Sequence, residues 1–236
     1  SRSLRRPLGP LRQLERPAEV SPRVLISFFL AASSFQVEDR FSDLISFLPV
    51  VVPGANHALS VDHIDAAAAL LANAKVVLVQ LEVRLAVVQR AVELAGHDTI
   101  IVLNPAPASE LPDDVLRHVD VITPNEHEVA LLGGAAALVA RGVANVVVTQ
   151  GARGALLVTR DGETRIEPFA VTPVDTTGAG DAFCGVLSAR LAVAGGLAEL
   201  ALALRAAAVG GALATQTAGA VPSLPAWSQV AAALQQ

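Results

Sequence analysis

From residue 49 onward, short apolar runs alternate with longer segments in which apolar residues recur every three or four positions. Short runs are typical of buried β-strands, and the longer period is typical of amphipathic helices. Strands are expected at residues 49–53, 76–80, 99–103, 119–123 and 146–149. Helices are expected from Ser60, a suitable N-cap, to about residue 73 and from 85 to about 95. Helical segments follow the later strands, and long alanine-rich helices are expected in the C-terminal part.

Residues 154–159 and 163–167 surround the pair Asp161-Gly162 and predict a β-hairpin. Elsewhere strands and helices alternate, which favours an α/β fold with a mainly parallel sheet sandwiched by helices, in three layers (αβα). Ligands of such sheets bind beyond the carboxyl ends of the strands. Polar residues that follow the expected strands should therefore gather at one edge of the sheet: Glu82, Asn104, Asn125 and Gly151.

The first 48 residues differ from the rest of the chain. They contain five of the seven phenylalanines, seven arginines and a single glycine. Three interpretations are open: a disordered arm, a targeting peptide with an arginine-rich start, or an aberrant beginning attached to a truncated domain, which we favour. We therefore divide the chain into an atypical segment, residues 1–48, disordered or non-native, and one α/β domain, residues 49–236.

The composition excludes several classes of function. The 236 residues are 53% hydrophobic with a formal net charge of −5. Mild acidity argues against a nucleic-acid partner, and no apolar run reaches the ~20 residues of a membrane span. The single lysine, Lys75, has no glycine beside it, which excludes a Walker A loop and a protein kinase. The single cysteine, Cys184, excludes an internal disulfide, indicates a reducing compartment and is expected to be a packed side chain.

Residues 174–183, Val-Asp-Thr-Thr-Gly-Ala-Gly-Asp-Ala-Phe, are the most informative for chemistry. The Gly-Ala-Gly turn of residues 178–180 precedes a helical stretch, and amide groups at such a helix start bind phosphate or another anion. At the mouth of this site, Asp181 could accept the proton of a hydroxyl group that attacks a bound phosphate. The alternatives are an N-cap role for Asp181 and a dinucleotide-binding turn, which would need glycine in place of Phe183.

Seven short motifs follow one another along the chain: Pro53-Gly54-Ala55-Asn56, Gln80-Leu81-Glu82, Asn104-Pro105-Ala106-Pro107-Ala108, Thr123-Pro124-Asn125-Glu126-His127-Glu128, Thr149-Gln150-Gly151-Ala152-Arg153-Gly154, Asp175-Thr176-Thr177-Gly178-Ala179-Gly180-Asp181-Ala182-Phe183 and Gly219-Ala220-Val221-Pro222-Ser223. In this order, over almost four fifths of the chain, they resemble the PfkB family of sugar kinases, and the second and third motifs are most similar to its ribokinase members. The resemblance implies a ribokinase-like fold, ATP-dependent phosphorylation of D-ribose at O5 to give ribose 5-phosphate, and ATP, Mg²⁺ and K⁺ as cofactors.

The resemblance assigns catalysis and sugar binding to the glycine turn and one further carboxylate. Asp181 is the expected catalytic base and a sugar contact, and Gly178, Ala179 and Gly180 are expected to form an anion hole. Glu82 is the expected contact of a sugar hydroxyl group. Taken alone, it would be a carboxylate favoured at a helix start.

The resemblance assigns the nucleotide and the metal ions to other segments. Nucleotide contacts are expected from Asn125, Thr149, Gln150, Gly151, Ala152, Arg153, Gly154, Gly180 and Asp181. Asn125 and Glu128 are expected to act on Mg²⁺ through water, because this ion prefers oxygen ligands and keeps several waters. Taken alone, they would be a capped helix start, and residues 149–154 would be an ordinary β-turn. A monovalent cation is expected at Asp175, Thr177, Ala214, Thr217, Gly219 and Ser223.

The sequence departs from the family pattern near its start. The family's first strand with its sugar-binding aspartate, its β-lid and its glycine-rich loop are not found in residues 1–50, which is why we favour an aberrant beginning. Because lid closure completes such sites, weak sugar affinity is expected. The alternatives are another PfkB sugar or nucleoside kinase and an inactive nucleotide-binding remnant. Expected partners are the sugar and ATP in the cytoplasm, with no nucleic acid or membrane, and a homodimer would lack the family's lid contact.

Overall fold

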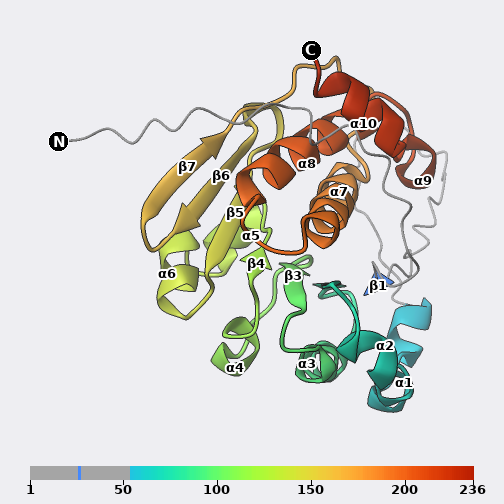
Figure 1. Cartoon of the computed structure of the whole chain (residues 1–236), viewed down its shortest axis with the longest axis vertical. Coiled ribbons are helices and arrows are strands. Elements are labelled where there is room, and N and C mark those ends of the chain that lie inside the picture. The colour runs from blue at the N-terminus through green and yellow to red at the C-terminus, as the bar shows by residue number, and fades with distance from the viewer. Residues whose placement is uncertain (1–25, 28–53) are drawn as a thin grey trace, which may run out of the picture.

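The computed structural model describes residues 26–27 and 54–236. The strand expected at residues 49–53 lies outside these residues. So does the segment 1–48, apart from a two-residue strand, β1 (Ile26–Ser27), which pairs with β2. Within the described part, a central sheet lies between two layers of helices (Figure 1). This arrangement confirms the predicted three-layer fold.

The sheet of the described residues has seven strands, which lie side by side in the order of the sequence. The remaining strands are β2 Val76–Gln80, β3 Ile100–Asn104, β4 Val121–Ile122, β5 Asn145–Thr149, β6 Ala155–Thr159 and β7 Gly162–Ile166. β1 to β5 are parallel, and β6 and β7 form the predicted antiparallel hairpin. β2 and β3 end level with each other, because Gln80 pairs with Asn104.

The helices lie mostly where the sequence places them. Their bounds are η2 Gly54–Ala58, α1 Val61–Ala66, α2 Ala68–Ala72, α3 Leu85–Leu94, α4 Asp113–Leu116, α5 Glu126–Leu131, α6 Ala135–Ala140, η3 Gly151–Arg153, α7 Ala179–Ala194, α8 Leu200–Ala214, α9 Ala220–Ser223 and α10 Trp227–Ala233. The helix expected over residues 60–73 is divided in two, because Ala67 leaves the helical region at φ −94° and ψ 6°.

Alternate residues of the parallel strands face two separate cores. In β2, Val77 and Val79 pack with residues of α1, α3 and α4, whereas Val76 and Leu78 pack with residues of α7 and α8. Figure 1 shows α7 and α8 on one side of the sheet and α3 and α4 on the other. Because both faces are covered, the strands are continuous runs of branched apolar residues, as is usual for parallel sheets.

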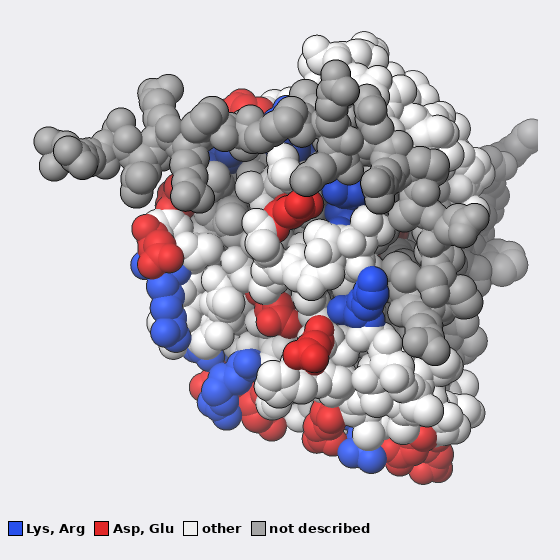
Figure 2. All heavy atoms as spheres, viewed as in Figure 1, with Lys and Arg blue, Asp and Glu red and all other residues white. Residues whose placement is uncertain are grey.

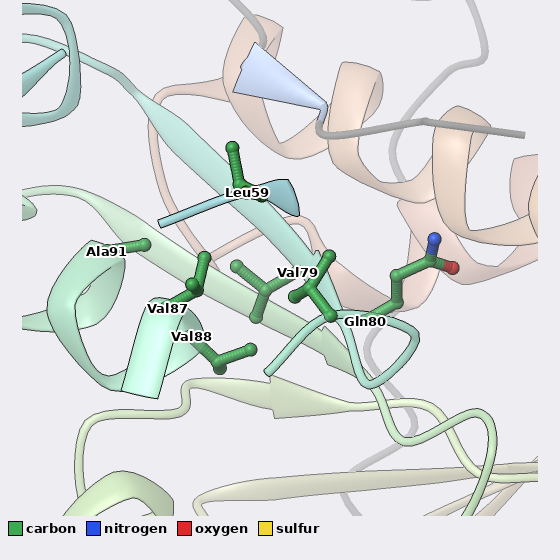
Figure 3. A pocket seen from close by; sticks show the side chains of 7 residues that line it. Leu59, Val79, Gln80, Val87, Val88 and Ala91 are labelled. Atoms are coloured by element: carbon green, nitrogen blue, oxygen red, sulfur yellow. The ribbon is translucent and has the colours of Figure 1, made fainter. Parts of the chain in front are cut away.

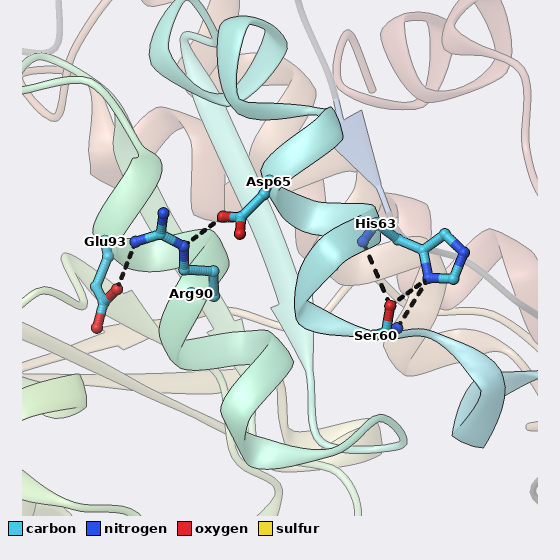
Figure 4. Close-up of polar contacts among 5 residues, drawn as sticks. All are labelled: Ser60, His63, Asp65, Arg90 and Glu93. Atoms are coloured by element: carbon cyan, nitrogen blue, oxygen red, sulfur yellow. Dashed lines mark hydrogen bonds and ion pairs between the residues drawn. The ribbon is translucent and has the colours of Figure 1, made fainter.

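Polar contacts fix the start of α1 and link it to α3 (Figure 4). The Ser60 hydroxyl oxygen accepts from the His63 amide, and the Ser60 amide donates to His63 Nδ1, which forms a capping box. Arg90 donates to Asp65 at 2.5 Å and to Glu93 at 3.0 Å. These ion pairs are solvent-exposed, so they contribute little to stability.

A small apolar cavity lies between β2, α3 and Leu59 (Figure 3). Its volume of about 10 Å³ is no larger than a single water requires, so it is a gap in packing and not a ligand site. The side chain of Gln80 points away from the apolar residues around it. None of the helices in residues 54–236 combines the length and the apolar character that crossing a bilayer would require.

Candidate functional site

The carboxyl ends of the parallel strands bring the predicted polar residues to one edge of the sheet. Glu82 follows β2, Asn104 ends β3, Asn125 follows β4 and Gly151 follows β5, and these strands are neighbours in this order. Asn125 also forms a parallel bridge with Thr149. The expectation that these segments meet at one edge therefore agrees with the sheet order.

The glycine turn forms the start of α7. Gly178 is the N-cap of this 16-residue helix and has a left-handed backbone, with φ +81°. A Cβ atom at this position would lie 3.1 Å from the Cα of Ala220, so the turn packs closely on α9. Glycine fits both requirements, because it tolerates positive φ and has no side chain.

The first turn of α7 leaves backbone donors free. Within residues 54–236, no hydrogen bond joins the amide groups of Gly180 and Asp181 to another group, whereas the Ala182 amide donates to the Gly178 carbonyl. Among the residues that the structure describes, none would lie within 4 Å of a Cβ atom at Gly180. Open space above unpaired amides at a helix N-terminus is suited to an anion.

Two carboxylates at this edge, those of Asp181 and Glu82, have raised pKa values. Burial raises the pKa of Asp181, which lies in the first turn of α7. Burial also raises the pKa of Glu82, and the negative charge of Asp181 raises it further. The Asn56 side chain, which donates to Glu82 Oε2 at 3.3 Å, acts in the opposite direction. The segments after β2 and before α7 therefore place two acidic groups within electrostatic reach of one another.

Cys184 lies beneath the site and is packed, as the sequence predicts. It is buried, and its thiol lies 3.3 Å from the Thr123 hydroxyl group. Burial raises the pKa of Cys184 to about 12, and the charges of Asp181 and Glu128 add to this effect. The thiol therefore stays protonated at neutral pH and does not act as a nucleophile.

Asp175 joins the glycine turn to the loop after α8. Its carboxylate accepts from the Thr177 amide at 2.9 Å and from the Gly219 amide at 2.8 Å. These hydrogen bonds lower the pKa of Asp175 to about 2. The amides of Val174 and Asp175 both donate to the Thr215 carbonyl, at 2.7 and 3.0 Å. The carboxylate is therefore ionised at neutral pH and holds the two loops together.

The residues assigned to the monovalent cation lie in or beside these two loops. Ala214 ends α8, Thr217 is exposed, and Ser223 is buried at the end of α9 with its hydroxyl group donating to the Ala220 carbonyl. The structure thus places the six predicted residues at the end of α8, in two connected loops and in a short helix.

Asn125 and Glu128 form a capping box at the start of α5. The Asn125 Oδ1 atom accepts from the Glu128 amide at 2.8 Å, and Glu128 Oε2 accepts from the Asn125 amide at 2.9 Å. This is the capped helix start that the sequence allows as an alternative to a metal site. The second carboxylate oxygen of Glu128 takes no part in the box. Within residues 54–236, no group of three or more His, Cys, Asp and Glu side chains is arranged to hold a metal.

The loop of residues 149–154 lies beside Asn125. The Thr149 amide donates to the Pro124 carbonyl at 2.9 Å, and the Gln150 amide donates to the Gly154 carbonyl at 2.8 Å. The two glycines of the loop differ. A Cβ atom at Gly154 would lie 2.1 Å from the Ile166 carbonyl oxygen, whereas one at Gly151 would have no neighbour within 4 Å in the described part of the chain.

Gly154 is therefore required for packing against the end of β7. Gly151 and Ala152, in contrast, lie on the exposed side of the loop. The guanidinium group of Arg153 pairs with the carboxylate of Glu126 on α5. This pair ties the loop to the helix that begins at Asn125.

A larger hollow lies elsewhere on the surface of the described residues. It has a volume of about 340 Å³ and is lined by Ala108, Ser109, Glu110, Leu111, Leu131, Leu132 and Arg141. None of these residues belongs to the predicted site. Arg141 pairs with Asp113 and donates to the Leu111 carbonyl, so its charge is already engaged. On the face shown in Figure 2, acidic and basic side chains are interspersed without a continuous patch of one sign.

Asn56 is the contact that sequence reasoning missed. The sequence shows it only as the last residue of a turn motif, whereas the structure places its amide on Glu82, 26 residues away. The separation of two residues along the sequence does not indicate that they form such a pair. The available clue was an asparagine in a short turn before a capped helix. If such a residue is buried, its amide requires a hydrogen-bond partner.

Comparison with known proteins gives a consistent result. The model of the pfkB family carbohydrate kinase matches residues 49–227. The chain is 38% identical over 188 residues to the bifunctional ribokinase/ribose-5-phosphate isomerase A of Fructilactobacillus sanfranciscensis, covering 74% of this chain and 34% of that protein. It is 41% identical over 150 residues to the deoxyribokinase of Salmonella typhi, covering 58% of this chain and 49% of that protein.

Solved structures agree with these relatives. The structure of Arabidopsis thaliana ribokinase complexed with ribose and ATP superposes with a TM-score of 0.69 at 25% identity, covering 79% of this chain and 64% of that chain. The chain spans about half or less of the length of these two curated relatives.

Proposed function

The chain belongs to the pfkB family of carbohydrate kinases, and we propose that it transfers the γ-phosphoryl group of ATP to the 5-hydroxyl group of D-ribose. The observation that carries this proposal is the start of α7, where unpaired amides and the carboxylate of Asp181 lie together. A phosphoryl transfer needs a site for the moving charge and a group that accepts the hydroxyl proton. The Arabidopsis thaliana relative, whose structure contains ribose and ATP, supports the choice of substrates.

In the proposed step, O5 of ribose attacks the γ-phosphorus, and the bond from this phosphorus to the bridging oxygen of ADP breaks. The hydroxyl proton passes to the carboxylate of Asp181. Because burial raises the pKa of Asp181, the carboxylate is a stronger base than an exposed aspartate would be. The amides of Gly180 and Asp181 and the dipole of α7 stabilise the negative charge of the transferred group.

The sugar would be held between the two carboxylates. Glu82 Oε2 is occupied by Asn56, which leaves the other oxygen to accept a hydrogen bond from a sugar hydroxyl group. Asp181 would meet the reacting hydroxyl group from the side of α7. The electrostatic effect of Asp181 on Glu82 supports their acting on a single small ligand.

The nucleotide would lie along the neighbouring loop. The bridge between Asn125 and Thr149 places the start of α5 beside residues 149–154, and Gly151 presents open space to a ligand. The Nη2 atom of Arg153 is engaged by Glu126, so the other guanidinium donors of Arg153 would have to approach the phosphate. Gly154 would act by shaping the loop and not by touching ATP.

The residues present fit two metal ions by their donor chemistry. The amide and carboxylate oxygens of Asn125 and Glu128 suit Mg²⁺ held through water, which would neutralise charge on the ATP phosphates. The carboxylate of Asp175 and the carbonyl groups of the loop after α8 suit a monovalent cation. Because Asp175 remains ionised down to a pH of about 2, it could serve as the counter-charge of that cation throughout the physiological range.

A second candidate acceptor is 2-deoxy-D-ribose. The 41% identity to the deoxyribokinase of Salmonella typhi favours this sugar as much as the other relatives favour ribose. Both sugars carry the reacting 5-hydroxyl group, so the chemistry proposed for Asp181 is the same for either.

An assay of ADP release tests the proposal. The purified full chain is mixed with ATP, MgCl₂ and KCl, and ADP is measured by coupling to NADH oxidation with ribose, deoxyribose, fructose, a nucleoside or no acceptor. Phosphorus NMR then identifies the position of the new phosphate ester. Asp181→Asn, which removes the base and keeps the shape of the side chain, is the control.

Sugar-dependent ADP release that yields a 5-phosphate and is lost in Asp181→Asn is the expected result. ADP release that is independent of any acceptor, or product formation that persists in Asp181→Asn, would refute the proposed reaction. Preference for deoxyribose over ribose would select the second candidate.

A further inference from the structure

Asn56 is a buried polar residue in a short turn. It lies in η2, ahead of the Ser60 cap of α1, and the residue is only 3% exposed. A buried amide without a partner costs free energy, so the position of the partner indicates what the side chain is for. The partner is the carboxylate of Glu82 beyond β2, at 3.3 Å.

Glu82 needs an external restraint to act on a ligand. It lies just past the end of β2, before α3 begins. A glutamate there has three rotatable side-chain bonds, and it faces the like charge of Asp181. Within residues 54–236, the hydrogen bond from Asn56 is the one that reaches its carboxylate. This bond fixes Oε2 and directs the other oxygen elsewhere.

The other groups near Glu82 do not supply this restraint. Arg84 donates to the Leu59 carbonyl at 2.8 Å, and among the described residues no hydrogen bond or ion pair joins it to Glu82. His57 is exposed. Asp181 is the charged group of the described residues that acts on Glu82, and it repels a negative carboxylate. An amide has no proton to lose or gain at ordinary pH, so its donation persists where a titrating donor would fail.

We propose that Asn56 is a positioning residue for sugar binding, which holds the Glu82 carboxylate with one oxygen free to accept a hydrogen bond from a hydroxyl group of the pentose. This proposal rests on the proposed function of the site. The amide acts through Glu82, counters the repulsion from Asp181 and does not itself touch the phosphoryl donor.

Asn56→Asp tests the proposal with little change in shape, because it replaces the amide donor with a second negative charge. The KM for ribose should rise about tenfold, the value expected for a lost hydrogen bond to a charged group. The KM for ATP and kcat should change by less than about twofold. Asn73→Ala is the control. It removes an exposed asparagine at the end of α2, which donates to the Ala69 carbonyl at 2.7 Å. The KM for ribose should not change in this variant.

A second measurement needs no catalysis. Carbon-13 labelling of the glutamate carboxyl groups follows the ionisation of Glu82, whose resonance is identified by its loss in Glu82→Gln. The pKa of Glu82 should be higher in Asn56→Asp than in the wild-type chain, because a donor is lost and a like charge is gained. Asn56→Ser, with a shorter donor, replaces Asn56→Asp if the latter does not fold, and should also raise this pKa.

The outcomes separate this proposal from the proposed function. An unchanged pKa of Glu82 in folded Asn56 variants would overturn the positioning role, whether or not the chain is a kinase. Equal effects on kcat and on both KM values would also overturn it, because they indicate a purely structural role. A raised pKa in a chain that phosphorylates no sugar would support the contact between the residues while refuting the kinase proposal on which the inference rests.

Discussion

Replacing Gly180 with alanine should separate stability from catalysis at the start of α7. Gly180 lies in the first turn of the helix, and a Cβ atom there would meet no atom of the described residues within 4 Å. The new methyl group therefore displaces no atom of the described residues. It would occupy the open space above the unpaired amides of residues 180 and 181, where the phosphoryl group is proposed to bind.

The two effects have opposite signs. Alanine in place of a helical glycine stabilises a protein by roughly 0.5–1 kcal/mol, which corresponds to a rise in Tm of about 1–4 °C for a chain of this length. Preventing the phosphoryl group from reaching one amide donor should lower kcat by about 10²–10³-fold, as in other oxyanion sites. The more stable variant should therefore be the poorer enzyme.

Differential scanning calorimetry and the coupled ADP assay measure the two quantities on the same preparation. Gly185→Ala is the control, because Gly185 lies in α7 and its Cβ position is also open within 4 Å. It should show the same rise in Tm with an unchanged kcat.

A wild-type kcat in Gly180→Ala, together with the expected rise in Tm, would refute the anion site at the start of α7. A fall in Tm of several degrees would instead show that the space above residue 180 is not open. A loss of kcat in Gly185→Ala as large as in Gly180→Ala would indicate that any added methyl group on α7 disturbs the site.

Three further substitutions test other parts of the argument. Asp175→Asn should reduce the loss of folding stability at acidic pH. The folded pKa of Asp175, about 2, lies below the unfolded value of about 3.9. In the wild-type chain this carboxylate therefore stabilises the fold fully above pH 4, and the stabilisation is lost as the pH falls toward 2. Urea midpoints between pH 2 and 5 measure it, and an unchanged pH profile would contradict the hydrogen bonds to this carboxylate. Gly154→Ala should lower the free energy of unfolding by about 2–4 kcal/mol, because φ is +84° and the new Cβ would lie 2.1 Å from the Ile166 carbonyl oxygen. Thermal unfolding measures this effect, and a Tm equal to that of Gly151→Ala would contradict the contact. Asp181→Asn should lower kcat about 10²–10⁴-fold, because the catalytic base is lost. It should also raise the free energy of unfolding at pH 7, because burial disfavours the charged carboxylate of the wild-type chain. A lower free energy of unfolding would show that this carboxylate has a favourable partner.

The sheet was largely predictable because its strands are buried on both faces. Residues 76–80 read as one branched apolar run and form β2 with the same bounds. The hairpin around Asp161-Gly162 was predictable because an Asp-Gly pair is typical of hairpin turns, and Gly162 has the positive φ, +132°, that such turns favour. The division of the helix after Ser60 was not predictable, because Ala67 is as good a helix former as its neighbours and the break depends on how α1 and α2 pack.

Contacts between distant segments limit what the sequence reveals about the site. The spacing of Asn125 and Glu128 predicts both a capping box and a magnesium pair, and the capping box is present, while the magnesium pair stays a prediction. Arg153 was expected near phosphate, but its pairing with Glu126, 27 residues earlier, depends on how α5 lies beside η3. Likewise, only the folded chain shows that Gly154 meets the backbone of β7.

The core between the sheet and α7 and α8 is built from segments that lie far apart in the sequence, and this affects folding during synthesis. Val76 and Leu78 of β2 complete their packing with Phe183 and Leu187 of α7, about a hundred residues further along. At a synthesis rate of about 5–20 residues per second, this face of β2 leaves the ribosome roughly 5–20 s before the helix that covers it. During that interval the nascent sheet exposes apolar surface to which chaperones can bind. The yield of folded chain in cells should therefore depend on chaperones more than its final stability suggests.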